Sequence, residues 1–129
     1  MAFADRAHAE AVIPISERPR AREFYRDTLG FELLRDEEAG MWFEAGRGSR
    51  LSLYESVGAG QSRHTLASFH VDDLEAAMEE LRGRGVVFEE YDQPGMKTEN
   101  GVASIGELRG AFFKDPDGNI LAVTEEVPA

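Results

Sequence analysis

The sequence predicts an α+β fold built from two tandem βαβββ modules. Two observations support this: the same order of strand and helix signals occurs twice in 129 residues, and a constant offset matches Ala11 with Ala67 and Arg26 with Arg82. A repeated order of elements indicates a duplicated structural unit. We expect one domain over residues 1–129, with modules at about 9–56 and 64–126, joined by a linker that contains GAGQSRH.

The first module opens with a strand at 9–16, where apolar and other residues alternate with the period of two that is typical of a strand. Pro14 lacks a backbone N–H, which favours an edge strand. A helix is expected from Pro19 to Leu29, because proline suits a first turn and Gly30 suits the position after a helix end. Turn-rich stretches then separate three expected strands, at 31–35, 41–45 and 50–55.

The second module repeats this order. A strand is expected at 66–71, followed by a helix that Asp72 caps, with Glu75 three residues later, and that ends at Gly83 and Gly85. Three further strands are expected at 86–91, 110–115 and 119–124, and Asp115-Pro116-Asp117-Gly118 is a type I turn between the last two.

Residues 92–109 have no counterpart in the first module. A connection of this length is usually functional or partly structured. Two interpretations remain open, a lid over a ligand site and a plain surface loop, and VASI within it is a candidate short strand.

Composition excludes several classes of function. The chain has 14 Lys and Arg against 25 Asp and Glu, a net charge of −11, which disfavours nucleic acid as a partner. It has no cysteine, so disulfides, thiolate metal sites and a cysteine nucleophile are excluded. We see no secretory signal and no apolar run of membrane-spanning length, and expect a cytoplasmic protein without membrane association.

The segments RAREFYRDTLGFEL, FHVDDLEAAMEELRGRGVVF and FFKDPDGNILAV resemble the vicinal oxygen chelate superfamily, the group of glyoxalases, bleomycin-resistance proteins and extradiol dioxygenases. The resemblance covers residues 9–126. It implies that each module's sheet curls into a half-barrel cup, with helices outside and a ligand cavity inside. It also implies an assembly of two chains, so we expect a homodimer, with module exchange left open.

Metal-using members of this superfamily carry His, Glu or Gln ligands at four cup-lining positions. The resemblance places Glu10, Ser52, Leu66 and Ala122 at those positions. Leucine and alanine offer no lone pair, and one carboxylate is too few for a divalent metal ion. We therefore expect no metal and no other cofactor.

Strand alternation predicts which side chains line the cup. The expected ligand-binding residues mix apolar and aromatic groups with a few polar ones, which suits a small aromatic molecule, and Trp42 beside a carboxylate also suits a cation. They are Glu10, Trp42, Ser52, Tyr54, Leu66, Ser68, His70, Phe112 and Ala122. Packing alone would also account for part of this set.

Three hypotheses of function follow. The first is a metal-free protein that binds a small aromatic or cationic molecule, with a resistance or sequestration role. The second is a metal-free lyase or isomerase, in which Glu10 or His70 acts as the acid or base. The third is a metal-dependent lyase or dioxygenase, as the fold alone would suggest. We favour the first and leave open whether the protein is an enzyme.

Overall fold

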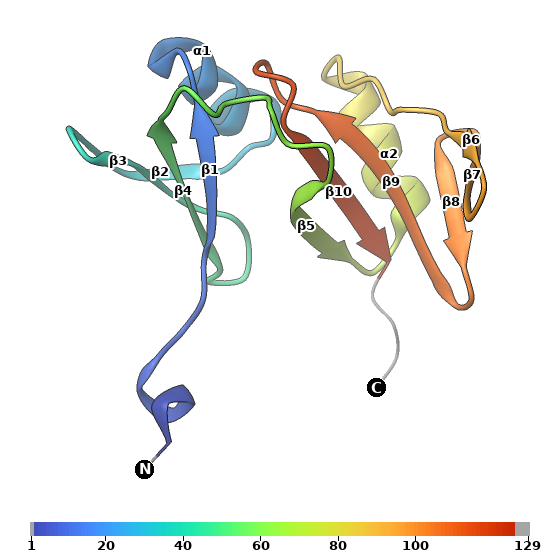
Figure 1. Ribbon diagram of the computed structural model, residues 1–129, viewed down its shortest axis with the longest axis horizontal. Helices are drawn as coiled ribbons and strands as arrows, with labels where there is room; N and C mark the ends of the chain where they lie inside the picture. Colours follow the sequence, from blue (N-terminus) through green and yellow to red (C-terminus); the bar gives the residue numbers. More distant parts are fainter. Residues whose placement is uncertain (1, 126–129) are drawn as a thin grey trace.

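The computed structural model describes residues 2–125, and its strands form two sheets that lie side by side (Figure 1). The first sheet has the order β1-β4-β3-β2 and the second the order β5-β10-β9-β8-β7-β6. In each, the first strand of the module pairs in parallel with the last, β1 with β4 and β5 with β10. This repetition confirms the α+β duplication. Residue 126, the expected end of the second module, lies outside the described residues.

The first module follows the predicted order closely. Its elements are β1 (Ala11–Ile15), α1 (Arg18–Glu23), a π-helical turn (Phe24–Thr28), β2 (Glu32–Glu37), β3 (Gly40–Glu44) and β4 (Arg50–Glu55). The predicted helix over 19–29 is thus an α-helix that widens into a π-turn, and Gly30 follows it with φ +79°. β1 is an edge strand, so Pro14 leaves no ladder hydrogen bond unmade.

The second module departs from the prediction in its middle. Its elements are β5 (Thr65–Val71), α2 (Leu74–Gly83), β6 (Asp92–Gln93), β7 (Met96–Glu99), β8 (Val102–Ile105), β9 (Leu108–Lys114) and β10 (Ile120–Glu125). A short 3-10 helix (Phe3–Arg6) precedes both modules and projects away from the sheets (Figure 1).

The predicted strand at 86–91 is wrong. Phe88 makes a single bridge to Phe113, and the Glu89 N–H donates to the Phe112 carbonyl at 2.7 Å. Val86 and Phe88 still alternate into the core, and this burial explains the period-two pattern without a continuous ladder. β8 instead takes the place next to β9.

The segment 92–109 is not a plain surface loop, and whether it covers a ligand site stays a prediction. It forms the antiparallel strands β6, β7 and β8 and the start of β9, which extend the second sheet. The VASI strand is confirmed as β8.

The cap of α2 is shifted by one residue from the prediction. Asp73, not Asp72, is the N-cap, and its carboxylate accepts from the Ala76 N–H at 3.1 Å. Asp72 instead forms an ion pair with Arg47 of the first module, 3.0 Å apart.

One apolar core joins the two modules. Ile13, Tyr25 and Phe43 of the first module belong to the same buried cluster as Met78 and Phe113 of the second. Ring contacts cross between the modules, with Phe24 and Phe113 centroids 6.4 Å apart and Phe31 and Phe69 centroids 5.3 Å apart. The two modules therefore share one apolar core within the described residues.

Candidate functional site

The face of each sheet that points away from this core is the candidate site. We call these two surfaces the open faces and define them by Val12, Trp42, Ser52 and Tyr54 in the first sheet and by Ser68, Phe112 and Ala122 in the second. Alternation sends Ile13, Leu51 and Leu53 into the core, so the neighbouring side chains on each strand point the other way.

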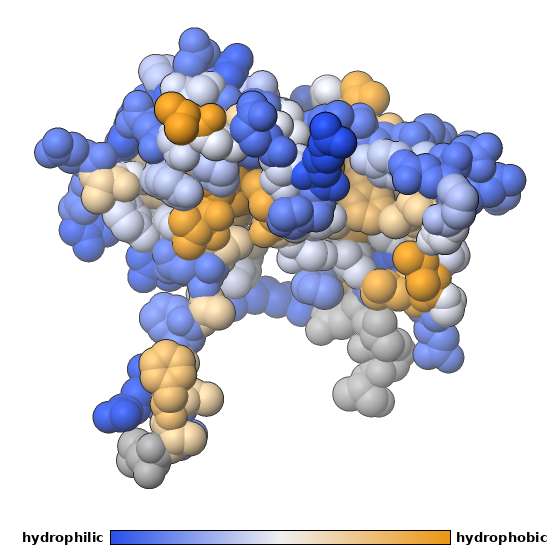
Figure 2. Space-filling view, in the orientation of Figure 1, coloured by the Kyte–Doolittle hydropathy of each residue, from blue (hydrophilic) through white to orange (hydrophobic). Residues whose placement is uncertain are grey.

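On the first open face, Val12, Ser52 and Trp42 lie side by side on three adjacent strands. Ser52 is the register partner of both Val12 and Trp42. Ser52 is buried, whereas Val12 is 55% exposed and Tyr54 is 40% exposed. Figure 2 views this side of the molecule and shows apolar patches over both sheets. This face therefore presents apolar and aromatic surface to whatever covers it.

A positively charged side chain of the protein, Arg35, already lies over the ring face of Trp42. The Arg35 guanidinium lies 6.0 Å from the ring centroid, and a bulge between Leu33 and Arg35 brings Arg35 into register with Trp42. The Glu44 carboxylate accepts from the Gly48 N–H at 2.8 Å. Both groups that would attract a cationic ligand are thus engaged, which favours the aromatic alternative.

The second open face carries hydroxyl groups. Ala122 is the register partner of Ser68 and Phe112. The hydroxyls of Ser68 and Thr124 are 2.6 Å apart and share a hydrogen bond. Phe112 packs edge-on against Tyr91, with centroids 5.7 Å apart. This face therefore combines apolar and aromatic side chains with one pair of hydroxyl groups.

The four positions that the superfamily uses for metal ligands do not fit a divalent ion here. Leu66 is half-buried and packs against the core, and Ala122 is buried. The Glu10 carboxylate is 4.0 Å from Arg50. Within residues 2–125, no three His, Cys, Asp or Glu side chains group in a way that could hold a metal ion. The side chains at these four positions therefore supply too few donor atoms to hold a divalent metal ion.

The structure does not join the two acid–base candidates in one cavity. Glu10 and Ser68 line a cavity of about 380 Å³ between β1 and β5. His70 is exposed and lines an adjoining groove that does not include Glu10. Trp42, Tyr54 and Phe112 lie on the open faces, outside both cavities. The predicted ligand-binding residues are thus spread over two surfaces of the single chain.

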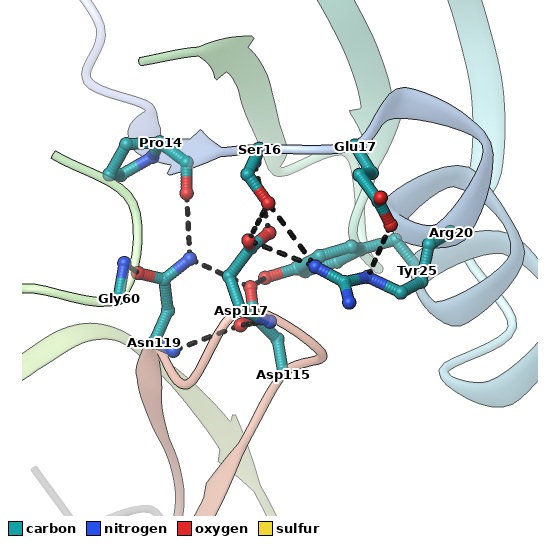
Figure 3. Close-up of polar contacts among 9 residues, drawn as sticks. All are labelled: Pro14, Ser16, Glu17, Arg20, Tyr25, Gly60, Asp115, Asp117 and Asn119. Carbon is teal, nitrogen blue, oxygen red and sulfur yellow. Dashed lines mark hydrogen bonds and ion pairs between the residues drawn. The ribbon is translucent and has the colours of Figure 1, made fainter. Parts of the chain in front are cut away.

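A polar cluster holds the modules together at one end of the sheets (Figure 3). The buried Asp115 carboxylate accepts from the Tyr25 hydroxyl at 2.7 Å and from the Asn119 side chain at 2.8 Å. Asn119 also donates to the Pro14 carbonyl at 2.7 Å and accepts from the Gly60 N–H at 2.9 Å. We call these five residues the inter-module latch.

The neighbouring Asp117 adds a charged contact to the latch. Its carboxylate is hydrogen-bonded to the Ser16 hydroxyl and lies 3.1 Å from Arg20. Burial raises the pKa of the Tyr25 hydroxyl well above its ordinary value, and the nearby Asp115 carboxylate adds to this rise. The turn at 115–118 is confirmed by the Gly118 N–H donating to the Asp115 carbonyl at 2.9 Å.

Sequence reasoning identified this turn but not its role between the modules. The hydrogen bond from Asn119 to Pro14 joins residues 105 positions apart, and a local sequence pattern cannot indicate such a contact. Arg35 was missed for a related reason, because a bulge shifts its phase.

No helix within residues 2–125 has the length and hydropathy to cross a bilayer.

The fold and the open faces define a paired-module α+β protein of the vicinal oxygen chelate type. A family model described as the Glyoxalase/Bleomycin resistance protein/Dioxygenase superfamily matches residues 7–123. The chain therefore belongs to this superfamily, as the resemblance implied. No curated protein matches the chain.

Solved structures share this fold over nearly the whole chain. TnmS3, an antibiotic binding protein from Streptomyces sp. CB03234, is 26% identical with a TM-score of 0.64, covering 94% of this chain and 97% of that one. A glyoxalase/bleomycin resistance protein from the same organism is 28% identical with a TM-score of 0.59, covering 89% and 98%. The fosfomycin resistance protein FosX from Listeria monocytogenes, at 12% identity, 94% and 93% coverage and a TM-score of 0.68, shows similarity of fold alone.

Proposed function

We propose that this chain is a metal-free binding protein that holds a small aromatic molecule on its open faces. The observation that carries the proposal is the side-chain chemistry at the four superfamily metal positions, where Leu66 and Ala122 have no donor atom. The surrounding surface, with Trp42, Tyr54 and Phe112, is suited to stacking on a planar ring. Sequestration of a toxic compound in the cytoplasm fits such a site, and the similarity to TnmS3 supports it.

The proposal includes a homodimer. Val12 and Tyr54 are too exposed in a single chain to enclose a ligand, and a small-molecule site normally buries most of its ligand. A second copy that covers the open faces would supply the missing wall. Two copies related by a two-fold axis would each contribute the same surface.

Trp42 is the only tryptophan of the chain and lies on the open face, so it reports directly on binding there. The test is a fluorescence titration of chelator-treated protein with a panel of planar aromatic antibiotics. We expect saturable quenching that does not change when Zn²⁺, Ni²⁺ or Fe²⁺ is added. Tyr54→Ala should weaken binding about tenfold, equivalent to about 1.4 kcal/mol.

Two results would contradict the proposal. One is a flat fluorescence response across the panel. The other is binding that chelation abolishes and one metal ion per chain restores. Val57→Ala, a loop substitution away from the sheets, is the control and should leave the titration unchanged.

A further inference from the structure

A groove separates the two modules beside β5 and α2, and it meets the second open face at Ser68. It has a volume of about 630 Å³, within the range of about 300–1,000 Å³ typical of small-molecule sites. The first module contributes Leu29, Phe31 and the loop at 45–49, and the second contributes residues 68–72 and the face of α2. We call this the inter-module groove.

Partly exposed apolar side chains gather on its walls. Leu29 and Phe31 come from the end of the π-turn, Phe69 from β5, and Ala77 and Leu81 from α2. All five pack against the buried core without being fully buried themselves. Covering such surface is favourable by about 25 cal/mol per Å², so the groove gains from an apolar occupant.

Aromatic rings mark the point where the modules meet in the groove. The Phe31 and Phe69 rings are 5.3 Å apart and tilted by 54°, and Phe113 lies at the base. Rings arranged in this way stack well on the face or edge of another planar ring.

The charges at the mouth are already paired. Arg47 of the first module and Asp72 of the second are 3.0 Å apart, and Glu80 is 3.6 Å from Arg84. His70 is the remaining titratable group on the lining. Paired charges give no net attraction for an ion, and the chain's net charge of −11 repels anions.

One wall also offers hydrogen-bonding groups. β5 is the edge strand of the second sheet, and among the described residues its ladder partner is β10 alone. The other edge of an edge strand presents backbone N–H and C=O groups. The groove follows this strand over residues 68–71.

We propose that the inter-module groove is a second ligand site, which takes an uncharged aromatic molecule with a polar edge. The apolar walls and phenyl rings hold the ring system, and the backbone of β5 meets its polar edge. The groove shares no lining residue with the first open face, so substitutions at Tyr54 and on α2 test the two proposals separately.

The test uses the neutral fluorescent probe N-phenyl-1-naphthylamine, with the full-length chain and matched tryptophan substitutions on α2. Ala77→Trp fills the groove and should weaken probe binding at least tenfold. Ala76→Trp places the same side chain on the exposed residue next to it and should leave binding unchanged. Tyr54→Ala on the open face should also leave it unchanged.

Circular dichroism shows whether Ala77→Trp folds. If it does not, Leu81→Gln, which keeps the helix and makes the wall polar, should weaken the probe several-fold. Unchanged binding in a folded groove variant would overturn the proposal, as would loss of binding in Tyr54→Ala. The anionic probe 8-anilinonaphthalene-1-sulfonate should bind at least tenfold more weakly, and equal binding would overturn the preference for an uncharged ligand.

Discussion

At the scale of single residues, Asn119 connects the first module, the linker and the turn at 115–118. It is fully buried and bonds to Pro14, Gly60 and Asp115. Asn119→Ala leaves the Pro14 carbonyl and the Gly60 N–H without this partner, so we expect a loss of about 2–3 kcal/mol in the free energy of unfolding. Urea denaturation measures it. Glu79→Ala on the exposed face of α2 is the control, with a change within about 0.5 kcal/mol.

Tyr25 should make stability depend on alkaline pH. Its pKa in the folded protein is raised by burial and by Asp115, whereas in the unfolded chain it is about 10. Below about pH 10 both states keep the proton and the stabilisation is complete. Above it the unfolded state loses the proton first, so stability falls as pH rises.

Tyr25→Phe should remove the part of the stability loss at alkaline pH that comes from titration of Tyr25. The measurement is the urea midpoint of both proteins between about pH 8 and pH 11. Parallel curves for the two proteins would show that Tyr25 does not titrate in this way.

At the scale of elements, Glu90 ties the turn between β7 and β8 to the body. Its carboxylate accepts from the Thr98 hydroxyl at 2.6 Å and the Gly101 N–H at 2.7 Å. These bonds lower the pKa of Glu90, the Thr98 contact most. Their contribution is present above the ordinary glutamate pKa and is lost as pH falls through the lowered value.

Glu90→Gln should therefore loosen residues 96–101 without unfolding the sheet. Hydrogen exchange measures it, with faster exchange expected at the Gly101 amide. Glu89→Gln, which changes only the ion pair with Lys114, is the matched control. Equal exchange in the two variants would exclude this role.

Strand and helix order was predictable because it depends on local alternation and turn residues. The strand β4 was predicted with both ends correct, and β1 and β3 to within two residues. The second module shows that a local pattern does not predict which strands pair. Val86 and Phe88 have the pattern of a strand, yet β9 pairs mainly with β8, and this choice depends on long-range packing.

The candidate site was predictable in part for the same reason. Alternation correctly placed Val12, Ser52 and Tyr54 on the side of the first sheet away from Leu51 and Leu53. Alternation does not reveal how far the two sheets enclose a space. The role of Val12, Ser52 and Tyr54 in ligand binding is therefore still a prediction.

At the scale of the whole molecule, a charged substitution on an open face tests whether two copies of the chain associate there. Val12→Asp places a carboxylate on the first open face, where a second copy would bury it and an unpaired buried charge is costly. We expect a shift from dimer to monomer in sedimentation velocity. Val57→Asp, on a fully exposed loop residue, should leave the dimer intact, and a wild-type chain that sediments as a monomer would refute the assembly.

The inter-module latch has a consequence for the chain's continuity. Pro14 and Tyr25 on one side and Asp115 and Asn119 on the other are bonded across the linker, and the apolar core crosses it as well. A polypeptide nicked within 61–64 should therefore hold together as a non-covalent pair of fragments. Such a pair of fragments would form a split protein, whose halves associate through the latch and the shared apolar core.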